Sequence, residues 1–143
     1  MMRIPSEVSY IRKISAEIES YLKANNIEDS AIFDIRLCAE EAVKNAILHG
    51  NGGKKDKAVF ISYSLEGGRF TLEVEDEGNG FDPRMVPDPT AEDNLLKGSG
   101  RGVFLIHKLM DEVKYNSRGN RIFMVKLINK NNGGKANAGQ AGR

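Results

Sequence analysis

The chain has 143 residues, of which 40% are hydrophobic and 29% charged, and its formal net charge is +1. This length suits one domain with one core, and the balanced charge gives no electrostatic reason to expect nucleic acid or an anionic membrane as the main partner. No apolar run approaches the roughly 20 residues that span a bilayer, and the first residues lack a signal-peptide core, so we expect a cytoplasmic protein. Cys38 is the single cysteine, which excludes an internal disulfide.

Two helices are predicted in the first third of the chain. Apolar residues recur at helical spacing over residues 6–24, with Ser6 as the expected N-cap. A second helix is predicted over residues 31–48, capped by Asp29 or Ser30 and with Phe33 among its apolar positions. The glycine-rich residues 50–53 should end this second helix.

Strands dominate the remainder. Residues 58–65 and 69–75 are predicted strands joined by a hairpin turn at residues 66–68. In the second of them Phe70, Leu72 and Val74 alternate with polar residues, so one sheet face should be packed and the other wet. A third helix is expected at residues 103–110. Two further strands are expected at residues 113–116 and 121–128.

This order of elements predicts an α+β fold. The simplest architecture is a two-layer α/β sandwich, in which about three helices cover one face of a mostly antiparallel mixed sheet. We expect one domain over residues 1–129. The Gly-, Asn-, Lys- and Ala-rich residues 130–143 cannot bury a core face and are predicted to be a disordered tail. Residues 82–97 form a long stretch without periodicity, which is typical of functional or disordered loops.

The predicted second helix carries the first motif, in which Glu41, Asn45 and His49 are four positions apart. Positions i and i+4 share a helix face, so these side chains should form one polar stripe in an otherwise apolar run. A buried polar stripe costs free energy unless something binds to it. Simpler explanations exist: Glu41 could be a surface glutamate, and His49 could interact with the helix C-terminus.

The second motif, Asp76-x-Gly78-x-Gly80, directly follows a predicted strand. Such residues are common in a turn that ends a strand. Alternatively, the glycines let the backbone approach a flat ligand, and the Asp76 carboxylate accepts a hydrogen bond from a donor such as the adenine amine.

The third motif, Gly98-x-Gly100-x-Gly102, comes just before the predicted third helix. Glycine-exposed N–H groups at a helix N-terminus favour anions, phosphates above all. The motif is not a dinucleotide fingerprint, because it is not Gly-x-Gly-x-x-Gly and follows no strand. The chain also lacks a P-loop and the His-Arg-Asp and Asp-Phe-Gly motifs of eukaryotic-type protein kinases.

Taken together and in this order, the three motifs resemble the nucleotide-binding (Bergerat) fold shared by gyrase, Hsp90, histidine kinases and the DNA mismatch protein family. The resemblance covers residues 4–128. Two sequences, Glu41-Ala42-Val43-x-Asn45 and the residues from Gly102 to Ile106, are most similar to the corresponding motifs of the bacterial anti-sigma factor serine/threonine kinases. The chain length and the short stretch before the first motif favour this branch over histidine kinases and gyrase-like ATPases.

The resemblance implies roles for individual residues. Glu41 would be the general base, Asn45 a Mg²⁺ ligand and Asp76 the acceptor for the adenine amine. Residues 82–97 would form an ATP lid, and either Lys97 or Arg101 would contact the terminal phosphate. The nucleotide site implied in full comprises Asn45, His49, Asp76, Gly78, Gly80, Phe81, Lys97, Gly98, Ser99, Gly100, Arg101, Gly102 and Val103.

The function implied is an ATP- and Mg²⁺-dependent serine/threonine kinase that phosphorylates a STAS-domain anti-anti-sigma protein. It would also sequester a sigma factor and act as a homodimer. An alternative is an ATP-binding module that switches a protein partner without phosphotransfer, and a third is a simple ATPase. One departure from the family pattern is the Gly-Asn that begins residues 119–122, where Gly-Thr is more usual.

Overall fold

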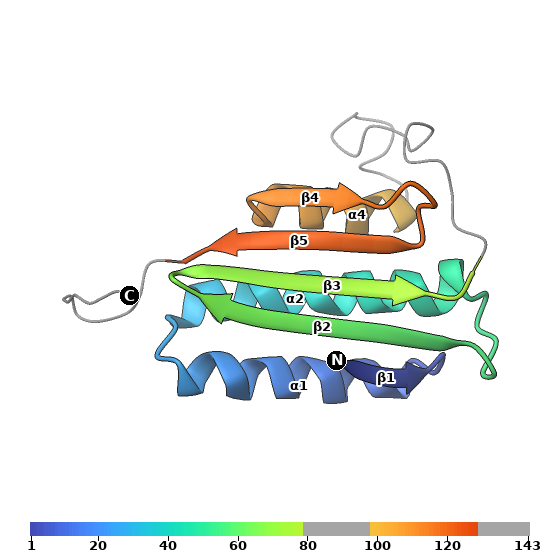
Figure 1. The fold of residues 1–143 in the computed structure, drawn as a ribbon, viewed down its shortest axis with the longest axis horizontal. Coiled ribbons are helices and arrows are strands. Elements are labelled where there is room, and N and C mark those ends of the chain that lie inside the picture. Colours follow the sequence, from blue (N-terminus) through green and yellow to red (C-terminus); the bar gives the residue numbers. More distant parts are fainter. Residues whose placement is uncertain (79–97, 129–143) are drawn as a thin grey trace.

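The computed structural model describes residues 1–78 and 98–128, with the backbone alone described for residues 98–101. The predicted lid and the predicted tail therefore lie outside the described residues. Figure 1 shows the sheet nearest the viewer, with the helices behind it. The elements, in chain order, are β1 (Met2–Pro5), α1 (Ser9–Ala24), α2 (Asp29–Asn45), the π-helical turn η1 (Ala46–Gly50), β2 (Ala58–Glu66), β3 (Arg69–Asp76), α4 (Gly98–Leu109), β4 (Glu112–Tyr115) and β5 (Arg121–Leu127).

The five strands form one sheet in the order β1-β2-β3-β5-β4, and every pairing between them is antiparallel. The α+β two-layer architecture expected from the sequence is thus confirmed. The hairpin between β2 and β3 is also confirmed: Glu66 pairs with Arg69, and Gly67 and Gly68 both have positive φ, at 57° and 77°. Glycine adopts such angles without the steric cost that a Cβ would bring.

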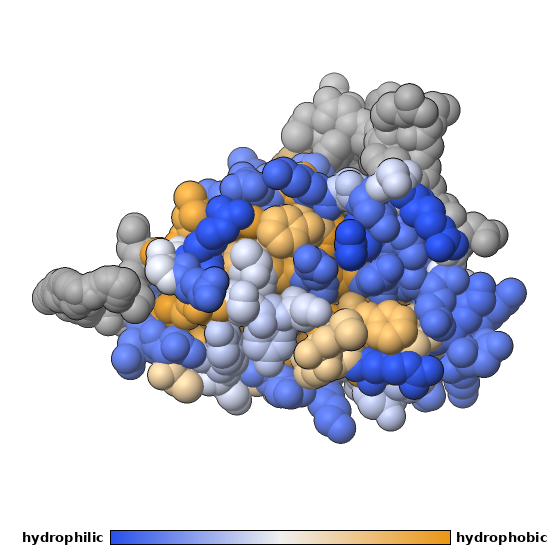
Figure 2. Space-filling model, viewed as in Figure 1, coloured by the Kyte–Doolittle hydropathy of each residue, from blue (hydrophilic) through white to orange (hydrophobic). Residues whose placement is uncertain are grey.

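The core lies between the helices and the inner face of the sheet. Phe70, Leu72 and Val74 of β3 are buried there, as their alternation predicts, and they belong to one cluster with residues of α1 and α2 such as Ile18 and Ile35. The opposite face of the sheet points toward the viewer in Figure 2, where hydrophilic side chains surround separate apolar ones. The prediction of one packed and one wet sheet face is therefore correct.

The N-terminal prediction is wrong in two respects. Residues 2–5 form strand β1, which is too short to carry a periodic signal, and α1 begins only at Ser9. The N-cap is Val8, without a side-chain cap bond. Ser6 is instead buried, and its Oγ donates a hydrogen bond to the carbonyl of Lys57, 2.7 Å away. Ser6 thus connects β1 to the residues before β2 rather than capping a helix.

The α2 prediction also needs correction. The N-cap is Glu28, so neither Asp29 nor Ser30 has that position. Phe33 is 66% exposed. The buried positions of α2, Ala31, Ile32, Ile35, Cys38, Ala39, Ala42 and Val43, follow a three- and four-residue spacing that turns residue 33 to the opposite side.

The predicted second helix changes geometry after Asn45. Residues 46–50 form a π-helical turn, in which the N–H of Asn51 donates to the carbonyl of Ala46 at 2.8 Å. A π turn adds one residue to a helical turn and so shifts the residues that follow it around the axis. As a result His49 is exposed, whereas Asn51 is only 2% exposed.

The third helix begins earlier than predicted, at Gly98 instead of residue 103, so the third motif forms its first turn. Within residues 1–78 and 98–128, no helix is long and apolar enough to cross a membrane.

Candidate functional site

A cavity of about 500 Å³ opens between α2, η1 and α4 and the ends of β3, β4 and β5. Its lining includes residues of the first and second motifs and Val103, which directly follows the third. Its lining residues are Ala42, Asn45, Ala46, His49, Gly50, Val74, Asp76, Val103, Ile106, Tyr115, Gly119, Asn120, Arg121 and Ile122. The helix side of the cavity is mostly apolar, with Asn45 and His49 as its polar residues, and the strand ends and turns add Asp76, Tyr115, Asn120 and Arg121. An apolar lining with several polar groups is common for small-molecule sites of this size.

The first and third motifs meet beside this cavity. Asn45 and His49, two of the three residues of the polar stripe, line it. Glu41 lies next to it: a Cβ added to Gly102 would overlap the Oε1 atom of Glu41 and lie 3.7 Å from Nδ2 of Asn45. The Glu41 side chain is 19% exposed and pairs with Lys44 at 3.2 Å. Because residue 102 is glycine, α4 can pack closely against α2 at the Glu41 carboxylate.

The first and second motifs also meet. A Cβ added to Gly50 would overlap the Asp76 carboxylate, and one added to Gly78 would overlap the carbonyl of Gly50. The backbone after α2 therefore packs directly against the turn after β3. Gly78 also donates its N–H to Oδ1 of Asp76 at 2.8 Å, which fixes that carboxylate at the cavity wall.

The surroundings of Asp76 shift the pKa of its carboxyl group. Burial raises the pKa of this carboxyl above its usual value, and the hydrogen bond from Gly78 partly offsets the shift. A desolvated carboxylate gains more from a hydrogen-bond donor on a ligand than an exposed one does. Asp76 is therefore suited to recognise an amino group on a flat molecule in the cavity.

Several residues that line the cavity were not predicted from the sequence to belong to the site. Tyr115, at the end of β4, lines the cavity, and burial raises its pKa. Asn120, in the β4–β5 turn, is buried and bonds to the end of β3. The single signal for Asn120 was the Gly-Asn in place of Gly-Thr noted above, and Tyr115 carried none, because it reads as an ordinary strand residue.

Part of the predicted site cannot be placed. Gly80, Phe81 and Lys97 lie outside the described residues, and for Gly98, Ser99, Gly100 and Arg101 the backbone alone is described. The choice between Lys97 and Arg101 as the terminal-phosphate contact therefore remains a prediction.

A metal ion at this site would have few protein ligands. In the described part of the chain no group of three or more His, Cys, Asp or Glu residues could hold a metal. Mg²⁺ does not need such a group, because it keeps several waters and binds phosphate oxygens. Asn45 lines the cavity near Glu41 and has an amide oxygen to offer, which fits that kind of shared coordination.

The contact between Gly50 and Gly78 gives a first prediction. We expect Gly78→Ala to weaken binding of ADP about tenfold, because the added methyl group must push apart Gly50 and the turn that carries Asp76, both of which line the cavity. Isothermal titration calorimetry measures the change. Gly52→Ala is the control: its methyl group would meet nothing within 4 Å, so it should lower stability through its φ of 61° and leave ADP affinity unchanged. Equal affinities in both variants would contradict the prediction.

The chain is similar to known proteins in both sequence and structure. Residues 4–126 match the histidine kinase-like ATPase domain family. The serine-protein kinase RsbW of Listeria innocua is 26% identical over 136 residues, which cover 90% of this chain and 87% of the relative. An anti-sigma F factor of Halalkalibacterium halodurans is 36% identical over 103 residues, covering 68% and 70% respectively.

Among solved structures, the histidine kinase domain of the blue-light activated histidine kinase from Erythrobacter litoralis superimposes with a TM-score of 0.54 at 20% identity. The match covers 87% of this chain and spans 62% of that one. At this identity the likeness concerns the fold.

Proposed function

Because the chain belongs to the histidine kinase-like ATPase domain family, we propose that it is an ATP-dependent protein serine/threonine kinase of the anti-sigma factor type. The observation that carries the proposal is that the three motifs come together at and beside one cavity. Glu41 and Asn45 lie against Gly102, and Asp76 lies against Gly50 and Gly78. Residues 1–129 form the catalytic domain in this proposal, in line with the family match over residues 4–126.

The nucleotide would lie between the second and third motifs. Asp76 accepts a hydrogen bond from the adenine amine, and the phosphates extend toward the first turn of α4, where unpaired backbone N–H groups favour negative charge. The apolar helix side of the cavity, with Ala42, Ala46 and Ile106, suits the flat face of the base.

Glu41 is the proposed general base. Its carboxylate takes the proton of a partner's serine or threonine hydroxyl as that oxygen bonds to the γ-phosphorus and the bond to the leaving ADP oxygen breaks. The neighbouring Asn45 would hold Mg²⁺, which neutralises phosphate charge when it is bound. Lys44, paired with Glu41 at 3.2 Å, holds the carboxylate on the helix surface next to Gly102.

We further propose that the phosphorylated partner is a STAS-domain anti-anti-sigma protein, and that the kinase also sequesters a sigma factor. The proposal includes a homodimer acting in the cytoplasm. The support is the likeness to relatives whose names are serine-protein kinase and anti-sigma F factor, with each of which the chain shares most of its length.

The test is to incubate the protein with γ-labelled ATP, Mg²⁺ and a STAS-domain partner, and to measure ATP affinity separately. A kinase transfers label to the partner. A binding module binds ATP and transfers nothing, and an ATPase releases labelled phosphate without a partner. If the protein binds neither ATP nor ADP, and Asp76→Asn changes nothing, the proposed function is wrong.

A further inference from the structure

One peptide unit at the cavity wall is held on both of its polar groups by buried asparagine side chains. It joins Asp76 and Glu77. Its carbonyl, on Asp76, accepts a hydrogen bond from Nδ2 of Asn120 at 2.8 Å, and its N–H, on Glu77, donates to Oδ1 of Asn51 at 2.8 Å. We call Asn51 and Asn120 the asparagine clamp. They are 2% and 6% exposed.

The two clamp residues come from opposite sides of the Asp76 turn. Asn51 follows the π turn η1, which directs its side chain inward. Asn120 precedes β5, and its own carbonyl accepts the N–H of Asp76 at 2.9 Å. The peptide between residues 76 and 77 is therefore bonded both toward α2 and toward β5.

Further bonds hold the clamp itself. Nδ2 of Asn51 donates to the Oγ atom of Ser6 and to the carbonyl of Ala58, both at 2.9 Å. Oδ1 of Asn120 accepts from Nδ2 of Asn116 at 2.8 Å. Both amides thus use their donor and acceptor atoms inside the protein. A fully bonded buried polar network holds its members in one arrangement, because any other leaves a group unpaired.

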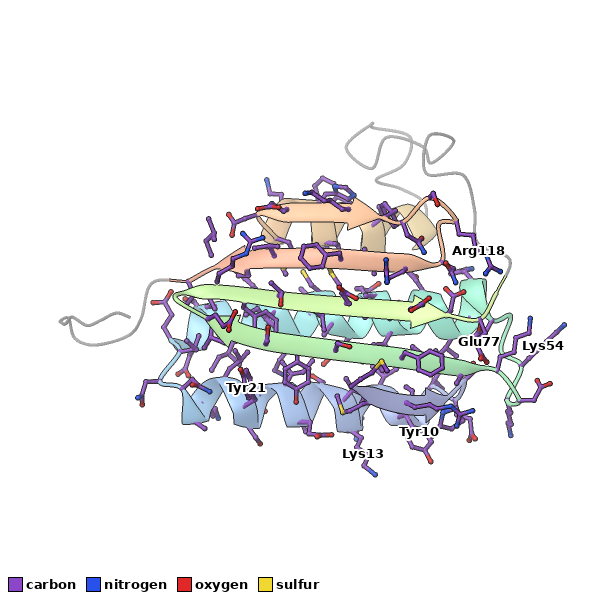
Figure 3. All side chains as sticks on the ribbon, in the orientation of Figure 1. Tyr10, Lys13, Tyr21, Lys54, Glu77 and Arg118 are labelled. Atoms are coloured by element: carbon purple, nitrogen blue, oxygen red, sulfur yellow. The ribbon has the colours of Figure 1, made fainter. Side chains whose placement is uncertain are left out.

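Other side-chain hydrogen bonds also hold the rest of the turn in place. Figure 3 shows Glu77 and Arg118 at the same end of the sheet. Oε1 of Glu77 accepts the N–H of Ala58 at 2.7 Å, and Arg118 donates to the carbonyl of Gly78 at 3.2 Å. A turn that only ended a strand would not need this many side-chain bonds to its backbone. The bonds converge on the segment that carries the Asp76 carboxylate.

We propose that Asn51 and Asn120 are positioning residues that orient the Asp76 carboxylate toward the purine base, and so set both nucleotide affinity and the preference for adenine over guanine. The inference rests on the proposed function, because it assumes that the cavity binds a nucleotide. The amine of adenine donates to a carboxylate, whereas guanine presents a carbonyl oxygen at the same ring position, which repels it. Discrimination therefore depends on how firmly Asp76 is held.

Asn51 and Asn120 contribute opposite hydrogen-bonding groups to the clamped peptide, and the test uses this difference. Asn51 contributes an acceptor to the clamped peptide and Asn120 a donor. Asp keeps the acceptor and loses the donor, whereas Leu loses both. We therefore expect Asn51→Leu, Asn120→Leu and Asn120→Asp each to weaken ADP binding about tenfold. The preference for ADP over GDP should fall in the same three variants.

The measurement is calorimetric titration with ADP and with GDP in Mg²⁺, at a temperature where circular dichroism shows each variant to be folded. Ser15→Ala is the matched control. Ser15 is also buried, at 1% exposure, but it bonds to Glu40 and Arg36 between α1 and α2, and it does not line the cavity. Its loss should lower the melting temperature without changing ADP affinity or base preference.

The outcomes separate a failure of this inference from a failure of the proposed function. Wild-type affinity and base preference in Asn51→Leu and Asn120→Leu overturn the inference while leaving the proposed function intact. Changes no larger than those of Ser15→Ala also overturn it, since they would reflect general loosening of the fold. If Asn51→Leu does not fold, the comparison of Asn120→Leu and Asn120→Asp with wild type decides by the same criteria. No ADP binding by the wild type overturns the proposed function, and this inference with it.

Discussion

Glu41→Gln is expected to slow transfer of phosphate to the partner by about 10²–10⁴-fold, the usual loss when a general base is removed. Glutamine has nearly the shape of glutamate but cannot take the proton of the attacking hydroxyl. Because the side chain still fits against Gly102, nucleotide binding and stability should change little. Single-turnover transfer from γ-labelled ATP to a STAS-domain partner measures the rate, and titration with ADP measures affinity.

Glu40→Gln is the matched control for this experiment. Glu40 is the preceding residue of α2, but its Oε2 accepts a hydrogen bond from Ser15 of α1 at 2.6 Å, so it points away from the cavity. The transfer rate of this variant should equal that of wild type. A Glu41→Gln protein that phosphorylates its partner at the wild-type rate would refute the general-base assignment and favour a base supplied by the partner.

Asp76→Asn is expected to have two opposite effects. Affinity for ADP should fall about 10–100-fold, because a charged acceptor for the base amine is replaced by a neutral amide. The protein without nucleotide should become more stable at neutral pH, because burial raises the pKa of Asp76 and the ionised form is therefore disfavoured in the folded state. Calorimetric titration and denaturant unfolding measure the two effects. Weaker binding combined with greater stability is the signature of a residue kept for its ligand.

The stability difference should depend on pH in a defined direction. A carboxyl whose pKa is raised on folding contributes stability that is fully present below its unfolded value and is lost as pH rises through the folded value. The advantage of Asp76→Asn should therefore be largest at neutral pH and disappear as the pH falls through the raised pKa of Asp76 toward its unfolded value. Glu66→Gln is the control, since Glu66 is exposed at the end of β2 and is not among the charges that shift the pKa of Asp76. An advantage that grows in acid would show that the shift has the opposite sign.

The sequence alone predicted the elements in which local pattern and tertiary packing agree. The alternation of Phe70, Leu72 and Val74 predicted a one-sided strand because each of these residues is buried in the core. The paired glycines of the β2–β3 turn predicted a hairpin because their backbone angles require glycine. The polar stripe and the Asp76 turn predicted a shared site, and the structure brings Asn45 and Asp76 to one cavity.

The features that the sequence did not predict have little or no local signature. A π turn is a single added residue within a helical run, so the pattern still looks like an α-helix through Leu48. Asn51 and Asn120 are in turns, where asparagine is common whatever its role. Their burial follows from contacts with Glu77 and Asp76, which are distant in the sequence. Phe33 looks like a core residue until the spacing of its buried neighbours is known.

The close contact of Gly50 with Gly78 also limits how this cavity can be redesigned. Both residues already have the smallest possible side chain, so no substitution at either position can widen the space between them. On this side the depth of the cavity is set by the main chain. Another part of the cavity wall consists of side chains from β4 and β5, those of Tyr115, Arg121 and Ile122. An enlarged cavity for a bulky purine analogue should therefore be engineered by trimming the β4–β5 wall.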